Sequence, residues 1–152
     1  MRISAKTDYA LRAAAELAAA PDGGPVKGER IADAQAIPLR FLENILGELR
    51  HAGIVESRRG AEGGYLLARP AAEIALADVV RAVDGPLANV GGRRPDALDY
   101  PGSAAQLREV WIAVRAGLRE VLERVTLADV VSGKLPGPVE QLISTDDAWK
   151  PH

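Results

Sequence analysis

The sequence has 152 residues, of which 47% are apolar and 26% charged, a composition typical of one globular domain with a small additional segment. No apolar run approaches the ~20 residues that a membrane-spanning helix needs, and the alanine-rich stretch Ala10–Ala20 carries charged side chains, unlike an export signal. The net charge of −2 gives no general attraction to nucleic acid, so such a function would depend on where the basic residues lie.

The composition of this chain disfavours disulfides and metal sites built from cysteine or histidine. There is no cysteine, which excludes disulfides and thiolate metal sites. The two histidines, His51 and the terminal His152, are too few for a histidine-built metal site within one chain.

The first two predicted helices lie close together in the sequence. Ser4–Ala20 is rich in alanine and leucine and is ended by Pro21–Pro25, which predicts a helix. A second helix is expected over Lys27–Gln35. A short turn leads to Pro38, which favours the first position of a third helix. Two helices joined by so short a turn predict a helix-turn-helix.

The stretch Phe41–Pro70 continues this pattern into a hairpin. Its first part has apolar residues at helical spacing, and Gly53 is expected to end the helix in the left-handed conformation. Two short strands, Ile54–Ser57 and Tyr65–Ala68, are predicted on either side of a basic, glycine-rich loop. A helix followed by such a hairpin predicts a winged helix-turn-helix, a mainly α fold with a small β-hairpin wing.

The second half of the chain is predicted to hold a dimerisation helix. A fourth helix is expected over Glu73–Val83, and Leu87–Gly102 is predicted to be a loop because glycine and proline interrupt it. Ser103–Val125 then has the longest helical pattern. Its apolar stripe consists of Leu107, Val110, Trp111, Val114, Leu118, Val121, Leu122 and Val125. The other helices already cover the body, so the expected partner is the same helix of a second chain; packing on its own domain is the alternative.

The chain is expected to end in a short helix and a tail. Thr126 and Asp129 fit a capping box that opens a helix over Leu127–Ser132. The remainder has no periodicity and is expected to be flexible. The predicted organisation is therefore a winged helix-turn-helix domain over residues 1–86, a loop over 87–102, the dimerisation and final helices over 103–134, and a tail over 135–152.

Three groups of residues resemble a known family. They are Ser4–Arg12, Arg30–Ala32 and Phe41–Pro70, the last of which contains Ser57-x-Arg59-Gly60-x-x-Gly63-Gly64-Tyr65. Together they are similar to the bacterial winged-helix regulators that include IscR, NsrR and CymR. The resemblance implies a cytoplasmic, homodimeric transcription regulator, expected to be a repressor that binds pseudo-palindromic double-stranded DNA.

The sequence departs from that resemblance in one segment. Family members that sense iron, nitric oxide or redox state carry three cysteines in the segment that matches Leu87–Gly102, which has none here. Asp8 matches an aspartate ligand of some nitric-oxide sensors, but one carboxylate cannot replace three thiolates. We therefore expect no iron–sulfur cluster and no other cofactor. Regulation would then come from a small-molecule effector, a partner protein or neither; Trp111 and Tyr100 could line an effector pocket or simply pack.

The wing carries the first candidate DNA contacts. Arg59 is predicted to enter the minor groove, where an A·T-rich sequence deepens the negative potential, and Arg58 to contact a phosphate. Gly60, Gly63 and Gly64 permit a tight hairpin and a close approach of the backbone to DNA. A nucleotide-binding phosphate loop would need a following helix and a Lys-Ser/Thr pair, which are absent.

The third predicted helix carries the second group of candidate DNA contacts. Arg40 can donate to guanine and Glu43 can accept from cytosine, while Leu39 lies in the same first turns. Further candidates are Phe41 as a half-buried backbone contact, Asn44 as a base contact, and Lys6 and Arg2 as phosphate contacts. Each of these side chains could instead belong to an ordinary solvated surface.

Two other classes of function compete with DNA binding. A winged-helix protein that has lost specific DNA binding could work as a protein-interaction or small-molecule-sensing module, which would suit the acidic balance of the chain. An enzyme is disfavoured, because no nucleophile–base pair, carboxylate dyad or metal cluster occurs at a workable spacing.

Overall fold

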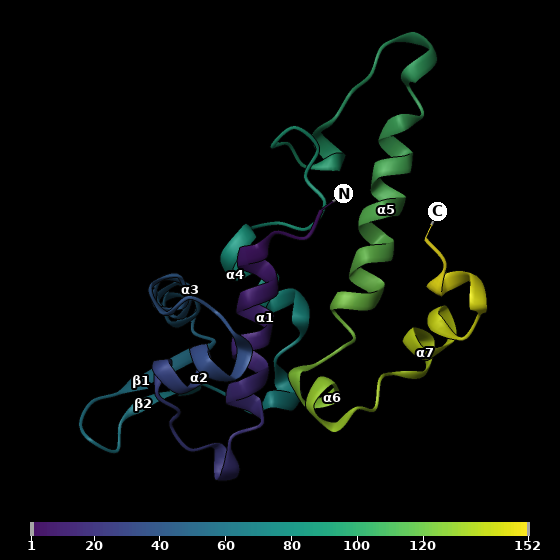
Figure 1. The fold of residues 1–152 in the computed structure, drawn as a ribbon. Helices are drawn as coiled ribbons and strands as arrows, with labels where there is room; N and C mark the ends of the chain where they lie inside the picture. The colour runs from purple at the N-terminus through teal and green to yellow at the C-terminus, as the bar shows by residue number, and fades with distance from the viewer. Residues whose placement is uncertain (1, 152) are drawn as a thin grey trace.

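Helix α1 (Ala5–Ala18) runs through the middle of the N-terminal body in this computed structural model, which describes residues 2–151 (Figure 1). The helix begins one residue later than predicted because the Ser4 hydroxyl caps it, accepting a hydrogen bond from the Thr7 amide at 3.0 Å. Its buried side chains are Thr7, Ala10, Ala13, Ala14 and Leu17. This mostly small face lets the surrounding helices approach α1 closely.

Helices α2 (Gly28–Gln35) and α3 (Leu39–His51) form the predicted helix-turn-helix. The turn is made by Ala36 in the left-handed conformation, with φ of 51°. Pro38 precedes the first residue of α3 rather than being part of it. The buried side chains of α3 are Leu42, Ile45, Leu46 and Leu49, which leaves its opposite face uncovered.

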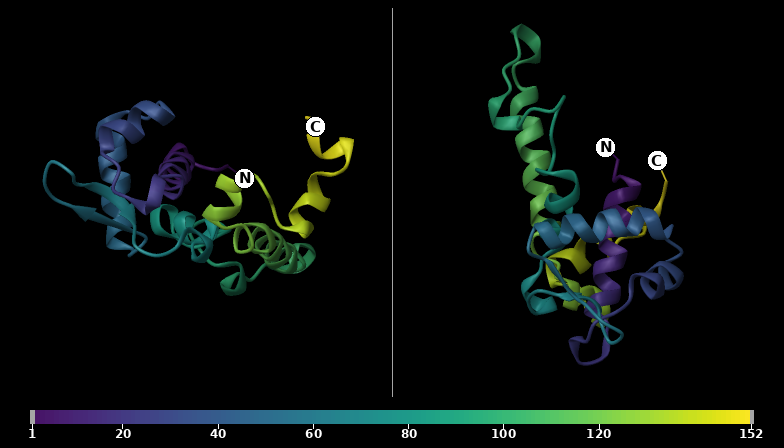
Figure 2. Two further views of the ribbon diagram at one scale, coloured as in Figure 1. Left: turned by 90° about the horizontal axis from the view of Figure 1, so that it is seen from below. Right: turned by 90° about the vertical axis from the view of Figure 1, so that its left-hand side faces the viewer.

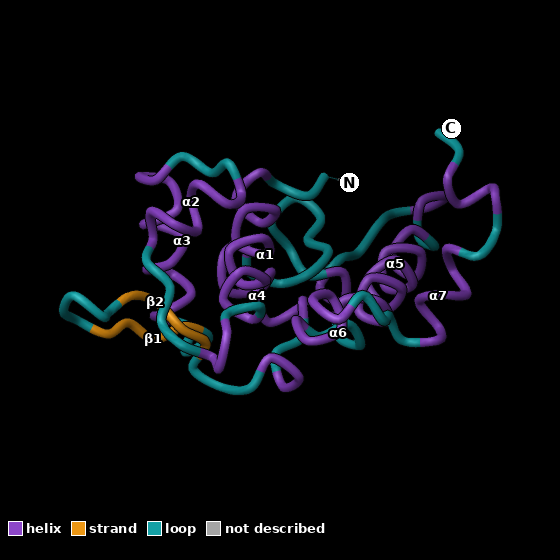
Figure 3. The backbone as a smooth tube through the Cα atoms, turned by 60° about the horizontal axis from the view of Figure 1, so that its bottom comes forward, coloured by secondary structure: helices purple, strands orange, loops and turns teal. Residues whose placement is uncertain are grey.

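The wing consists of β1 (Val55–Arg58) and β2 (Gly64–Leu67), paired antiparallel with Ser57 opposite Tyr65. The sequence did not indicate a third segment, Val26, which pairs with Tyr65 through two backbone hydrogen bonds of 2.7 and 2.8 Å. This pairing fixes the base of the wing to the segment that precedes α2. The tip of the wing points away from the helices (Figures 1 and 3).

Helix α4 (Leu76–Asp84) is shorter than predicted, because residues 71–73 form a separate 3-10 turn. The Asp78 carboxylate accepts a hydrogen bond from the Ala75 amide at 3.0 Å and so caps the helix. Ala75 also pairs with Thr126, which returns the chain to the body after the long helix. The predicted final helix, α6 (Leu127–Ser132), follows there with its capping box formed and Leu127 fully buried.

Helix α5 (Leu107–Leu122) lies apart from the body and extends beyond it (Figures 1 and 2). It is shorter at both ends than predicted, since a 3-10 turn over Gly102–Ala104 precedes it. None of the described residues of α5 is buried. Val125 lies beyond the helix, and its side chain is only 3% exposed within the chain's own core. Its assignment to a dimer surface is therefore wrong.

The C-terminal segment is helical where no regular structure was expected. Helix α7 (Gly137–Ile143) has a proline in its first turn, and a 3-10 turn follows over Asp146–Trp149. The Trp149 indole donates a hydrogen bond to the Ile143 carbonyl at 2.8 Å. Figure 3 shows the wing and this segment at opposite ends of the molecule. Across residues 2–151, no helix is long and apolar enough to cross a membrane.

Candidate nucleic-acid interface

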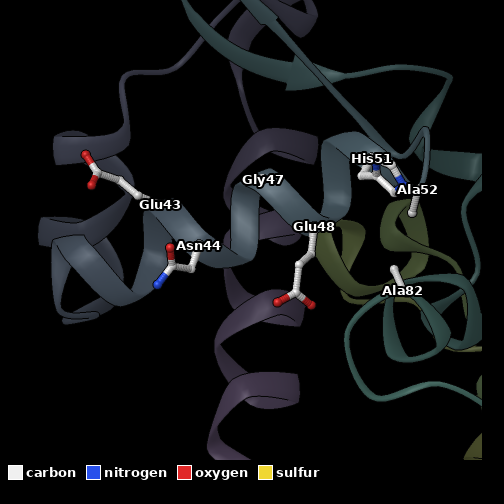
Figure 4. A pocket seen from close by; sticks show the side chains of 7 residues that line it. All are labelled: Glu43, Asn44, Gly47, Glu48, His51, Ala52 and Ala82. Atoms are coloured by element: carbon white, nitrogen blue, oxygen red, sulfur yellow. The ribbon is translucent and has the colours of Figure 1, made fainter.

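The exposed face of α3 carries the candidate base contacts. Leu39, Arg40, Glu43 and Asn44 are all exposed, on the side of α3 away from its buried leucines and isoleucine. A hollow of about 580 Å³ follows this face (Figure 4). Its lining residues are Glu43, Asn44, Gly47, Glu48, His51, Ala52 and Ala82. The hollow therefore borders α3 from Glu43 to Ala52 and reaches Ala82 of α4, whereas Leu39 and Arg40 lie outside it.

Gly47 lies at the middle of this face. A Cβ atom at this position would have no neighbour within 4 Å, so packing within residues 2–151 does not require a glycine there. Glycine in the middle of a helix costs roughly 0.5–1 kcal/mol relative to alanine. Its presence leaves the backbone of α3 bare at the centre of the hollow.

Phe41 joins the first turn of α3 to α1. Its ring meets the ring of Tyr9 in a T-shaped contact, with centroids 5.9 Å apart and planes at 85°. The Arg12 guanidinium carbon lies 4.8 Å from the centroid of the Tyr9 ring. Since 48% of Phe41 stays exposed, this side chain both packs on α1 and borders the surface, as expected.

The wing tip presents two exposed arginines. Arg58 ends β1 and Arg59 opens the tip loop. Gly63 is required for closure, because a Cβ there would lie 2.2 Å from the Arg58 carbonyl oxygen. Gly64 is required for the same reason at the base, where a Cβ would lie 2.6 Å from the Val26 backbone. The role of these glycines lies in hairpin geometry, and Gly60 adds a φ of 99° that favours glycine.

Unpaired guanidinium groups gather in the N-terminal part of the chain. Within residues 2–151, the arginines that form no ion pair or hydrogen bond are Arg2, Arg30, Arg40, Arg58 and Arg59. The remaining arginines, almost all of them later in the chain, have partners in the chain. Arg30 of α2 is a further candidate DNA contact that the sequence did not single out. Its exposed position on the helix is the signal that could have identified it. Exposed cations without a partner in the chain are available to attract a polyanion such as DNA.

Lys6 has a structural role that the sequence did not indicate. Its ammonium group lies 2.8 Å from Glu48 Oε2 and donates a hydrogen bond to the Val83 carbonyl at 2.9 Å. These contacts join α1 to α3 and to the end of α4. The lysine is therefore already committed within the chain, and its expected phosphate contact is not supported.

The apolar stripe of α5 forms a second surface. Leu107 and Val110 are 41% and 49% exposed. Trp111, Val114, Leu118, Val121 and Leu122 are half-buried. A helix with so many partly uncovered apolar side chains leaves a face available to a further polypeptide. Tyr100 is also half-buried, but neither it nor Trp111 lines a described pocket.

The segment between α4 and α5 does not fit an iron–sulfur cluster. It has no thiol, and Arg93 and Arg94 bring positive charge to it. Asp8 is paired with Arg12 at 3.0 Å. No group of three or more His, Cys, Asp or Glu side chains that could hold a metal ion occurs in the described part of the chain.

Comparisons with known proteins agree with this geometry. A family model described as "Rrf2: Iron-dependent Transcriptional regulator" matches residues 3–133. An HTH-type transcriptional regulator of Mycobacterium tuberculosis is 52% identical over 142 residues, which cover 93% of this chain and 88% of the relative. The regulator CymR of Bacillus subtilis is 36% identical over 132 residues, covering 87% of this chain and 91% of CymR.

Comparison with solved structures also finds transcriptional regulators. The structure of CymR, the global cysteine regulator of B. subtilis, has a TM-score of 0.75 at 34% identity and covers 88% of this chain and 98% of CymR. IscR of T. potens has a TM-score of 0.72 at 34% identity and covers 88% of each chain. These relatives are transcriptional regulators and not enzymes, and their likeness agrees with the predicted winged-helix fold. The chain belongs to the Rrf2 family of transcriptional regulators.

Proposed function

We propose that this transcriptional regulator is a cytoplasmic homodimer that binds a pseudo-palindromic operator and represses transcription without an iron–sulfur cluster. The observation that carries the proposal is the bare face of α3 beside a wing with two unpaired arginines. Arg40, Arg58 and Arg59 have no partner among residues 2–151, so their donors are available to DNA.

Base recognition is assigned to the exposed side of α3. Arg40 can donate two hydrogen bonds to one guanine, and Glu43 can accept from a cytosine. Asn44 and Leu39 complete this side, and Gly47 allows the helix backbone to come close to the groove wall. Phe41 lies at the edge and supports the first turn through Tyr9.

Positioning is assigned to the wing and to the free cations around it. Arg59 would enter an adjacent minor groove, while Arg58, Arg2 and Arg30 would contact phosphates. Because phosphate contacts release counterions, affinity would fall steeply with salt, by a slope of about 0.9 per neutralised phosphate. The overall charge of −2 does not oppose this, since Arg40, Arg58 and Arg59 are exposed and unpaired among residues 2–151.

Dimerisation is assigned to α5. The partly uncovered stripe from Leu107 to Leu122 would pack against its copy in a twofold dimer. Such a dimer presents two copies of α3, which accounts for a pseudo-palindrome with half-sites about one helical turn apart or a multiple of it.

Selection of duplexes from a randomised library, with purified cofactor-free protein at physiological salt, tests the proposal. We expect an enriched pseudo-palindrome and a complex of two chains on one duplex. Absence of enrichment, with a folded dimer in solution, would favour the interaction-module alternative. A reporter gene downstream of the enriched site separates repression from activation.

A further inference from the structure

A second pocket lies between the winged-helix body and α5. Its volume is about 230 Å³, smaller than the ~300–1,000 Å³ of sites for drug-sized ligands. The lining residues are Arg81, Pro86, Leu87, Arg94, Arg115 and Arg119. Four of the six are arginines, and they come from α4, from the segment that follows it, and from α5.

The arginines are held in place by two carboxylates. The Asp96 Oδ1 atom lies 2.6 Å from Arg115 Nη1 and 3.2 Å from Arg94 Nε. The Glu123 Oε1 atom lies 3.0 Å from Arg119 Nε and is also paired with Arg81. Each carboxylate therefore uses a single oxygen to hold two guanidinium groups.

The charges of this group do not cancel. Four guanidiniums against two carboxylates leave two positive charges around one small pocket. A guanidinium has five N–H donors, and each of these arginines uses one of them in its ion pair. Most of their donors make no hydrogen bond to the described part of the chain.

We propose that this arginine pocket binds a small anion with two or more negative charges, bearing phosphate or carboxylate groups. Such a ligand would neutralise the excess charge and accept hydrogen bonds from arginines on three elements at once. Arg115 is the most enclosed of the four, with 23% of its side chain exposed, and Arg119 lies one turn further along α5. The ligand would therefore join α5 to the body.

Because of this position, a bound anion would affect the arrangement of α4 and α5 relative to each other. Arg81 belongs to the same helix as Ala82, which borders the hollow along α3. An anion that holds Arg81 close to Arg115 and Arg119 would set the angle between the winged-helix body and α5. Anion binding itself does not depend on the DNA-binding proposal, so each can fail without the other.

Isothermal titration calorimetry of the 152-residue protein without DNA tests the inference. The probes are inorganic phosphate, pyrophosphate and citrate, each at the same ionic strength, because exposed charges are screened by salt. We expect saturable binding of at least one probe, with a dissociation constant below about 1 mM. Loss of one charge-assisted contact in Arg115→Gln or Arg119→Gln should weaken it by about tenfold or more.

Arg124→Gln is the matched control. Arg124 is ion-paired with Glu120 at 2.8 Å and does not line the pocket, so its loss should leave probe affinity unchanged. Circular dichroism of each variant shows whether it is folded. Equal weakening by Arg124→Gln would mean general charge attraction, and no saturable binding of any probe to the folded wild type would overturn the proposal. The proposal would also fail if the pocket variants lower DNA affinity while the wild type binds no probe, since DNA would then be the occupant.

Discussion

The rings of Tyr9 and Phe41 meet at 85° with their centroids 5.9 Å apart, which connects α1 to the first turn of α3. Arg12 lies over the same Tyr9 ring, so three side chains from two helices form one contact group. This group fixes the end of α3 that carries Leu39 and Arg40. The position of the proposed base contacts thus depends on aromatic packing as well as on the buried leucines.

A double-mutant cycle measures this connection. Tyr9→Leu and Phe41→Leu keep an apolar side chain at each position but remove the ring contact. We expect a coupling of about 0.5–1.5 kcal/mol in the free energy of unfolding, measured by urea denaturation. Additive effects of the two substitutions would show that the rings contribute only as apolar volume.

Gly47→Ala should separate stability from DNA binding. A Cβ at position 47 has open space, so the helix should gain roughly 0.5–1 kcal/mol of stability. The same methyl group would project from the proposed DNA-facing side of α3 and should lower affinity for the selected duplex. Urea denaturation and fluorescence anisotropy give the two readouts. A more stable variant with unchanged affinity would mean that the α3 backbone does not approach DNA closely.

The ion pairs around the arginine pocket should make the free energy of unfolding depend on pH. The hydrogen bond from Arg115 holds the pKa of Asp96 below its ordinary value, with smaller help from Arg94. Arg119 and then Arg81 lower the pKa of Glu123 in the same way. A carboxylate with a depressed pKa stabilises the fold above its unfolded pKa, and this contribution disappears as the pH falls through the folded value.

Carboxylate NMR titration tests that dependence directly. Arg115→Gln should raise the pKa of Asp96 towards its ordinary value, whereas Arg124→Gln should leave it unchanged. High salt should reduce the difference, because these groups are exposed. An Asp96 pKa that is the same in the wild type and in Arg115→Gln would contradict the described ion pair.

The dimer assignment predicts a contrast between two sides of α5. Val114→Glu places a charge within the proposed interface, and an unpaired buried charge costs several kcal/mol, so the variant should be monomeric. Ala116→Glu adds the same charge to an exposed position on the opposite side of the helix and should remain dimeric. Light scattering after gel filtration measures both masses. A dimeric Val114→Glu variant would move the interface elsewhere.

Local patterns in the sequence were sufficient for the body of the fold. Apolar spacing located α1 to α4 and the capping box at Thr126 located α6. The wing followed from two short strands around a glycine-rich loop. Helix α7 was missed because seven residues are too few to show periodicity and its opening glycine and prolines suggested a loop.

Contacts between distant residues could not be predicted in the same way. A single-residue pairing such as Val26 with Tyr65 leaves no pattern in the sequence. The arginine pocket unites residues from 81 to 119, and Lys6 finds its partners far along the chain at Glu48 and Val83. Val125 continues the spacing of the α5 stripe, but the chain turns before it and buries it in the body.

The affinity of four proteins for the selected duplex tests the central claim most directly. They are the wild type, Arg40→Ala, Arg59→Ala and the charge-matched control Arg124→Ala, each titrated against the selected duplex, single-base variants and a scrambled duplex. Arg40→Ala should cost about 1–3 kcal/mol and abolish discrimination at one base pair, while Arg59→Ala should weaken binding and reduce the salt slope by about 1. Arg124→Ala should match the wild type. Wild-type affinity in both test variants would show that the surface of α3 and the wing is not where this protein binds DNA.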